Sequence, residues 1–339
     1  MQIGNFPKNY LKYPFNPLNT KNNFYLDFKK KITKENFFLS KFFVKYQNVY
    51  LKKDYKIENF FFSINENLIY IPFTSKNVGK IIHFSFYSLP VTVYSKKQLN
   101  FYEFKIVIKK FLKNFSFINA KYNFLMVTNY EELSKIDLNT TNPFLVEELQ
   151  IINLNLDQNK IFDNMKLNHK NEIKKISKVN DIKFKLYDHN NYSKGLISNM
   201  MKMHEEVSGR KTRSLETWNM NEEMIQKKMA FIVEVSYKEK IISYSFFYHN
   251  LEECCYFSSV TVKDSFNLGG INHAGVWHAI KFAKKLGLKR MKLGTTKYLY
   301  ARNKNLIDEK RKNIAFFKSR FCGETEINIT VDEETNIES

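Results

Sequence analysis

Short apolar runs separated by polar turns fill residues 24–150. Phe60–Ile64 and Leu68–Phe73 flank three polar residues, and this pattern predicts a β-hairpin. A further strand-like run extends from Ile81 to Tyr94, and the stretch from Phe101 to Phe111 is typical of a helix. The first half of the chain is therefore expected to mix strands and helices, and it holds no catalytic motif that we recognise.

The middle of the chain changes to helical periodicity. Leu145–Leu156 predicts a strand that leads into a helix over 159–178, and a second helix is predicted over 192–207, breaking at Gly209. His169 lies on the apolar face of the first helix, and we interpret it as a packed core histidine. The residues that recur at gaps of three and four on that face are Phe162, Met165, His169, Ile173 and Ile176.

The last third combines strands with a glycine-containing loop over 267–275, which leads into a helix that ends near Leu286. We expect residues beyond about 155 to form a mixed sheet with Cys254–Val262 as its central strand, an α+β arrangement. The other predicted elements of this part are strands at Ala230–Tyr237, Ile241–His249, 289–293 and 325–331 and a helix at 309–320.

The length and composition indicate two domains. The chain has 339 residues and is 43% hydrophobic, enough for two cores of ~150 residues each. We place a first domain at 1–150 and a second at 151–331. Residues 332–339 are predicted to form a solvated acidic tail, because Glu324–Ser339 holds six acidic groups and no basic one.

The formal charge of +20 suggests a nucleic-acid partner, because clustered Lys and Arg neutralise phosphates. The lysines are dispersed, however, and the abundance of Lys, Asn, Ile, Phe and Tyr indicates low-GC coding. The unusual residues carry more information, and they gather after residue 190: eight of the ten Gly, both Trp and every Arg. We therefore expect the chemistry in the second half.

The chain holds no apolar run as long as the ~18 residues of a spanning helix, and its first residues lack the pattern of a signal peptide. We expect a cytoplasmic protein without membrane insertion. Cys254 and Cys255 stand in a strand-like run with no Cys or His pair at metal-ligand spacing. We interpret all three cysteines as reduced structural thiols and expect no metal.

Three stretches carry a resemblance to a known family. Lys166–Lys178 is a basic helix, Met203–Trp218 reads MHEEVSGRKTRSLETW, and Phe316–Glu324 reads FFKSRFCGE. In order and spacing they resemble the FemAB-like branch of the GNAT acyltransferase superfamily over roughly residues 145–325. Two positions depart from its pattern: Lys170 stands where an Arg is usual, and Cys322 is inserted before the glycine of the closing FK-x-x-FG element.

The resemblance implies two tandem GNAT-like domains, the first divergent, and acyl transfer from a thioester or a tRNA ester to an amine. In a GNAT fold the donor's pyrophosphate binds at a helix start, where free N–H groups and the helix dipole favour anions. Acyl-CoA is the co-substrate expected there. The alternative is a flexible turn with Asn272 capping the helix. The predicted donor-binding residues are Gly269, Gly270, Asn272, His273 and Gly275.

Arg210 and Arg213 are candidate acceptor-binding residues, because a guanidinium grips phosphate or carboxylate in a bidentate manner that Lys cannot offer. The alternative is a surface ion pair with a nearby glutamate, which contributes little to stability. Trp218 is assigned to the same group, either packing beneath the arginines in the core or stacking on a ring of the substrate.

His204 and Glu205 are the plainest general-base candidates, because a neutral imidazole can relay an amine proton near pH 7. His249, His273 and His278 compete with them. A further alternative is that no side chain is the essential base and that proton transfer is assisted by the substrate.

Lys318 is the third predicted catalytic residue. The resemblance implies that the pair Phe317 and Lys318 holds a nucleotide-linked acceptor or stabilises charge during transfer, and an ammonium offers three donors for that role. The alternative is that Phe316, Phe317 and Phe321 fill the core while Lys318 is solvated.

The function expected from the sequence is transfer of an acyl group, most readily from acyl-CoA, to an amine on a nucleotide-linked sugar or cell-envelope precursor. The acceptor rests on the family analogy. An aminoacyl-tRNA-dependent transferase is the nearest rival, with the basic surface as its docking face. A non-catalytic nucleic-acid-binding protein is disfavoured, because no recognised nucleic-acid motif is present. The oligomeric state stays open.

Overall fold

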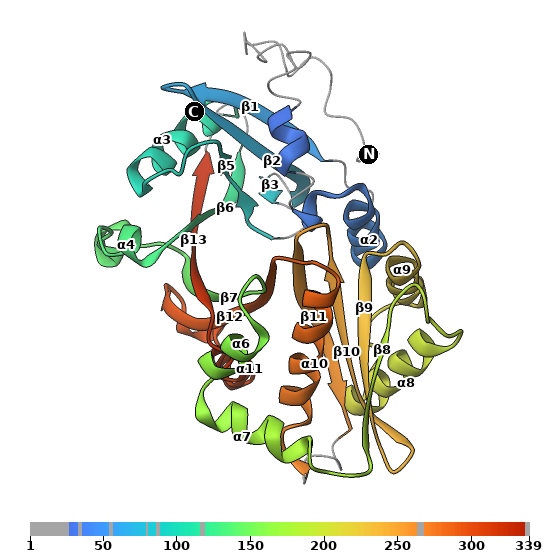
Figure 1. Cartoon of the computed structure of the whole chain (residues 1–339). Coiled ribbons are helices and arrows are strands. Elements are labelled where there is room, and N and C mark those ends of the chain that lie inside the picture. Colours follow the sequence, from blue (N-terminus) through green and yellow to red (C-terminus); the bar gives the residue numbers. More distant parts are fainter. Residues whose placement is uncertain are drawn as a thin grey trace.

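We describe the fold from a computed structural model of the chain (Figure 1). None of the helices in the part of the chain that it describes is long and apolar enough to cross a lipid bilayer. The structure describes residues 27–32, 36–53, 57–78, 81–85, 89–115, 119–262 and 268–335.

One continuous sheet runs through both halves of the described chain (Figure 1). Its strand order is β1-β2-β3-β6-β13-β7-β12-β11-β10-β9-β8, with β4 paired to β6 and β5 paired to β2. The last strand of the chain thus lies between the two halves. The elements of the first half are η2 (Phe37–Leu39), α2 (Lys41–Leu51), β1 (Glu58–Ile64), β2 (Asn67–Val78), β3 (Ile81–Ser85), β4 (Val91–Thr92), β5 (Tyr94–Ser95), α3 (Phe101–Leu112), β6 (Ala120–Thr128), α4 (Tyr130–Leu133) and α5 (Leu138–Thr141).

The second half confirms the predicted mixed sheet: β11 pairs parallel with β12 and antiparallel with β10. Strand β7 spans the predicted limit between residues 150 and 151, so the domain limits stay a prediction. The elements are β7 (Leu145–Asn153), α6 (Gln158–Asn164), α7 (Leu167–Ile176), β8 (Ile182–Tyr187), α8 (Leu196–Ser208), α9 (Leu215–Gln226), β9 (Ala230–Tyr237), β10 (Lys240–His249), β11 (Glu253–Thr261), α10 (Ile271–Lys285), β12 (Arg290–Ala301), η4 (Lys304–Leu306), α11 (Glu309–Ser319) and β13 (Glu324–Thr335).

Helices cover both faces of the second half of the sheet. One core contains the inner sides of α2, α8 and α9, and the other contains those of α7 and α10. The adjacent residues Cys254 and Cys255 point into these two different cores, because successive strand residues face opposite sides. Burial raises the pKa of both thiols, in keeping with inert structural cysteines.

One helix was predicted wrongly from the sequence, and another was missed. The helix predicted over 159–178 is divided into α6 and α7, because Met165 takes an extended conformation and the backbone N–H of Lys166 donates to Arg320 O at 3.0 Å. Helix α9 was not predicted at all. It begins after Ser214, whose hydroxyl accepts the N–H of Thr217 in an N-cap.

The predicted acidic tail was wrong for residues 332–335, which continue strand β13 beside β6. Opposite charges explain the extension. Asp332 pairs with Arg302 at 2.8 Å, Glu334 pairs with Lys121 at 2.6 Å, and Glu333 pairs with a lysine of α3. The acidic residues are thus matched by basic neighbours rather than solvated alone. Residues 336–339 of the predicted tail lie outside the described residues.

Gly323 holds the start of β13 against β7, and its replacement by alanine should destabilise the fold. A Cβ at this position would lie 2.2 Å from Ile151 O, and backbone atoms cannot move aside cheaply. We expect Gly323→Ala to lower the free energy of unfolding by ~1–3 kcal/mol or more in urea denaturation.

The control is Gly209→Ala, because no atom lies within 4 Å of that Cβ position. Its φ of +68° still disfavours a side chain, so we expect a loss of ~1 kcal/mol. An equal or smaller loss for Gly323→Ala would contradict the close contact.

Candidate active site

A wedge opens in the sheet between β11 and β12. The two strands pair only where Glu253–Cys255 meets Arg290–Lys292, although both strands continue well beyond these residues. Helix α10 connects them in the parallel crossover. Beyond these residues the two strands no longer pair with one another, so we take the wedge as the candidate binding site.

Lys318 projects from α11 to the side of this wedge. Its Nζ lies 5.9 Å from the centre of the Tyr256 ring on β11, and a Cβ added to Gly294 on β12 would lie 2.9 Å from it. Gly294 has a φ of +89°, so a side chain there would be both strained and in the way. Burial lowers the pKa of Lys318, and the charge of Glu147 opposes this shift. The ammonium is thus half-buried between both strands.

The C-terminal end of α11 is fixed by Gln150 on β7. In the amide orientation that satisfies both polar atoms, the Gln150 side chain donates to Lys318 O at 2.7 Å and accepts from Gly323 N at 2.8 Å. Cys322, the insertion in the closing motif, takes a left-handed backbone with a φ of 50°. The inserted residue is therefore accommodated in the turn, and Lys318 keeps its place on the helix.

Phe317 packs with the buried His169 and with the half-buried His273. The His169 ring lies 4.1 Å from the His273 ring and 5.7 Å from Phe317, and its Nε2–H donates to Phe317 O at 2.9 Å. His169 is therefore a core histidine, as predicted. The alternative that all three phenylalanines fill the core was wrong: Phe321 is buried, but Phe316 is 57% exposed.

The predicted donor-binding loop has a carboxylate at its centre. A Cβ on Gly269 or Gly270 would lie 2.9 Å from Glu172 Oε2, which is buried without a hydrogen-bond partner among the described residues. Asn272 accepts a hydrogen bond from Thr261 at 2.7 Å instead of capping α10, whose N-cap is Gly270. The Glu172 carboxylate and the Lys175 ammonium thus both lie beside the turn that starts α10.

The other two predicted donor-binding residues lie in the body of α10. Gly275 is buried, and its Cβ position is 3.9 Å from Ser245 Oγ. Burial lowers the pKa of His273, against the opposing charge of Glu172. Both residues pack α10 onto the sheet and α7.

Arg213 forms a second cluster, built from both halves of the chain. Its guanidinium lies 5.0 Å from the Trp218 ring and 5.8 Å from the Phe257 ring, and Nη2 is 3.5 Å from Ser258 Oγ. Burial raises the pKa of Tyr46 on α2 to about 12, although the charge of Arg213 opposes the shift. Within the described ranges, no carboxylate lies within ion-pair distance of Arg213, so its charge is available for an anionic ligand.

His204 belongs to the same cluster. Its ring lies 5.2 Å from the ring of Trp218, and its Nε2 is 3.3 Å from the hydroxyl of Ser258. Burial and the charge of Arg213 lower the pKa of His204 to about 4. Trp218 is buried beneath the arginine, which agrees with the packing alternative.

Glu205 and Arg210 are not brought into this cluster. Glu205 follows His204 on α8 and so points about 100° away around the helix. Arg210 is exposed in the segment after Gly209. Two of the competing histidines lie elsewhere: His249 bonds its own neighbour Asn250 at the end of β10, and His278 stacks on Phe184.

The two clusters lie on opposite faces of β11. Tyr256, beside Lys318, packs into the core of α7 and α10, whereas Phe257, beside Arg213, packs into the core of α2, α8 and α9. Sequence reasoning missed Tyr46, Tyr256 and Ser258, because tyrosine and serine are common in this chain and their positions depend on strand pairing. The sequence around Gly294 likewise does not predict its positive φ.

The described residues hold no group of three His, Cys, Asp or Glu that could bind a metal ion. The expectation of metal-free chemistry stays a prediction.

We compared the chain and its fold with known proteins. No protein-family model and no curated protein sequence matches the chain. Among solved structures, FemX superposes with a TM-score of 0.58 at 9% identity, covering 86% of this chain and 92% of FemX. The chain has a FemAB/GNAT-like fold. This superposition extends over both halves of the chain and confirms the predicted α+β fold class.

Weaker similarities extend the list of neighbours. L-PGS from Bacillus licheniformis gives a TM-score of 0.45 at 14% identity, over 81% of this chain and 84% of that one. A tandem GNAT protein from the clavulanic acid biosynthesis pathway gives 0.43 at 5% identity, over 83% and 84%.

The buried His169 should make this FemAB-like fold sensitive to acid. Burial and the neighbouring His273 lower its pKa to about 4, below the ordinary 6.5. The unfolded chain therefore binds more protons between pH 6.5 and 4, and stability falls as the pH falls through this window. We expect a loss of ~2–3 kcal/mol from this residue, seen as a lower urea midpoint at pH 4 than at pH 7.

The comparison variant is His169→Phe, which keeps a ring beside Phe317 and Phe321 but cannot titrate. Its stability should depend less steeply on pH over the same window. If the free energy of unfolding of this variant depends on pH as steeply as that of the wild type, other groups cause the acid sensitivity. His204 and His278 are then the first to test.

Proposed function

We propose that the protein is an N-acyltransferase that moves an acyl group from an activated donor to an amine. The observation that carries the proposal is the Lys318 ammonium, half-buried at the side of the wedge in a FemAB/GNAT-like fold. Acyl transfer develops negative charge on the donor carbonyl oxygen, and preorganised donors in a water-poor site stabilise it. Lys318 is the group suited to that task.

The positions of the two clusters suggest how the reactants meet. Lys318 and Arg213 contact neighbouring residues of β11 from opposite faces of the sheet. Beside them the strands β11 and β12 are separated. We infer that the donor carbonyl lies in the wedge and that the acceptor approaches from the side of Arg213, so that its amine reaches the carbonyl between the strands.

Arg213 is proposed to bind an anionic group of the acceptor. Its guanidinium carbon lies 5.0 Å from the centre of the Trp218 ring, and no carboxylate in the described part of the chain lies within ion-pair distance. This arrangement suits a phosphate or a carboxylate. A nucleotide-linked amino sugar or a cell-envelope precursor carries both an amine and a phosphate or carboxylate. We propose that the protein is cytoplasmic and binds such a compound in the cytoplasm. Arg210, being exposed, is placed to contact its outer part.

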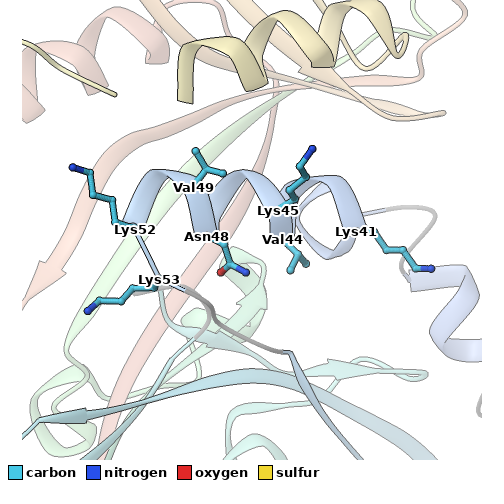
Figure 2. Close-up of a pocket in the computed structure, with 7 residues that line it drawn as sticks. All are labelled: Lys41, Val44, Lys45, Asn48, Val49, Lys52 and Lys53. Atoms are coloured by element: carbon cyan, nitrogen blue, oxygen red, sulfur yellow. The ribbon is translucent and has the colours of Figure 1, made fainter. Parts of the chain in front are cut away.

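The contacts of Lys318 and Arg213 say less about the chemical identity of the acyl donor. Acyl-CoA stays the donor expected from the sequence, although the Glu172 carboxylate lies next to the predicted donor-binding glycines, with Lys175 beside it. A negative charge there disfavours a pyrophosphate, so we propose an aminoacyl-tRNA as second candidate donor, since its acyl group needs no pyrophosphate site. A basic docking face is available on α2, where an open hollow is lined by Lys41, Lys45, Lys52 and Lys53 together with Val44, Asn48 and Val49 (Figure 2).

Replacement of Lys318 should stop turnover and spare the fold. The Lys318 side chain is half-buried, and methionine fills a similar volume. A charge-assisted hydrogen bond contributes ~1.5–3 kcal/mol, so Lys318→Met should lower kcat/KM by roughly tenfold to over a hundredfold. The assay measures transfer of labelled acetyl from acetyl-CoA, or of labelled amino acids from charged total tRNA, to UDP-linked amino sugars and peptides.

The matched control is Lys289→Met, whose lysine is exposed and paired with Glu252 away from the wedge. It should keep wild-type turnover. A ligand panel by thermal shift selects the reactants first, because a ligand at 100 times its Kd adds ~2.7 kcal/mol of stability. Full activity in Lys318→Met with the selected pair would remove Lys318 from the mechanism.

A tRNA donor predicts binding that weakens steeply with salt, because several phosphate contacts release counterions. Replacing Lys41, Lys52 and Lys53 together by glutamine should lower both the affinity for total tRNA and its salt dependence. Lys45 is left unchanged, because it pairs with Glu223. Filter binding at 50 and 200 mM salt measures both quantities. Affinity that stays flat over this range would exclude the tRNA donor.

A further inference from the structure

Strand β12 is irregular where it passes β7. The pairing between them shifts register three times, between Lys292 and Gly294, between Thr295 and Lys297, and between Tyr298 and Tyr300. Such bulges are common beside active sites, where they redirect side chains. This stretch contains Gly294, against which the Lys318 ammonium lies, so the distortion is centred on the proposed reaction site.

Glu147 on β7 is a half-buried carboxylate at this distortion. It accepts a hydrogen bond from Thr295 Oγ1 at 2.9 Å, and no cation of the described ranges pairs with it within 4 Å. Burial raises its pKa, while the charges of Arg311 and Lys318 on α11 oppose the shift. Burial and the charge of Glu147 also raise the pKa of Tyr298 on β12. The carboxylate is therefore close enough to Lys318 for the two charges to influence one another.

A second acceptor stands beside Glu147. Asn328 on β13 is its direct partner in the antiparallel register, and directly opposed side chains lie on the same face of a sheet. The Asn328 Oδ1 atom is buried and has no hydrogen-bond partner among the described residues. Buried polar atoms in native proteins are nearly always satisfied, so this acceptor needs a donor. A carboxylate and an amide oxygen side by side suit an amine.

We propose that Glu147 and Asn328 bind the acceptor amine and that Glu147 is the general base of the transfer. The proposal rests on the acyltransferase function above. As the amine nitrogen forms its bond to the donor carbonyl carbon, Glu147 takes the amine proton. When the bond from that carbon to the donor oxygen or sulfur breaks, the proton passes to the leaving atom. Lys318 stabilises the intervening oxyanion, and both residues return to their starting states.

This role separates Glu147 from the base candidates predicted from the sequence. His204 is hydrogen-bonded to Ser258, and its pKa of about 4 makes it a weak base. Glu205 points away from that cluster. A base works best when its pKa approaches the working pH, and burial moves Glu147 in that direction.

The first test is Glu147→Gln, measured with the donor and acceptor pair identified by the panel. A general base typically contributes ~10²–10⁴-fold, so kcat should fall by at least about a hundredfold while donor binding is kept. In the wild type, kcat/KM should fall as the pH drops through the pKa of Glu147, and this acid limb should vanish in the variant. Wild-type kcat in Glu147→Gln would overturn the proposal.

The matched control is Glu148→Gln on the same strand. Its carboxylate faces the other side of the sheet, where it accepts hydrogen bonds from Thr296 and Tyr130. This variant should keep the wild-type kcat and pH profile, and circular dichroism should show that both variants are folded. An equal loss in both variants would assign the effect to the strand and overturn the specific role of Glu147.

A second test does not depend on turnover, so it separates this proposal from the proposed function. Removing the charge of Glu147 should increase the neutral fraction of Lys318. Acetylation of Lys318 by N-hydroxysuccinimidyl acetate, followed by mass spectrometry, should therefore be several-fold faster in Glu147→Gln than in wild type. Equal labelling rates would overturn the arrangement even if acyl transfer is observed. Faster labelling with no transfer by wild type would instead overturn the proposed function, and with it the role of general base, but keep the charge arrangement of Glu147 and Lys318.

Discussion

The structure depends on the pairing of β13, which is hydrogen-bonded to β6 on one side and to β7 on the other. This single strand joins the sheet of the first half to that of the second. It also fixes α11, because the chain passes from the helix to the strand through Gly323, which is pressed against Ile151. The position of Lys318 is therefore a consequence of strand pairing at the centre of the molecule.

The second organising feature is the short pairing of β11 with β12. Where the strands separate, two neighbouring residues of β11 contact different cations. Tyr256 lies against the Lys318 ammonium, and Phe257 lies against the Arg213 guanidinium. Two cations on opposite faces of one strand can each neutralise an anionic part of a reactant without repelling one another at close range. The charge of Glu147 opposes the effect of burial on the pKa of Lys318 and so complements the ammonium.

The sequence predicted most elements of the second half, because apolar alternation and turn residues are local signals. Strand β9 matches its predicted limits, and Lys318 and Arg213 stood out by motif and by residue type. Other features depend on distant partners. Met165 interrupts a helical pattern because Lys166 bonds Arg320 O, and the acidic residues after Val331 form a strand because Arg302 and Lys121 pair with them. Glu147 and Asn328 gain meaning only when β7 and β13 are paired.

The central place of β13 also affects how the protein is made. Every other strand of the sheet is synthesised first, yet β6 and β7 stay unpaired along their facing edges until residues 324–335 arrive. Pairings between distant segments form slowly, and open strand edges bind other chains. Until β13 pairs, the chain therefore holds two half-sheets with open edges, so chaperone protection is needed most before this pairing forms.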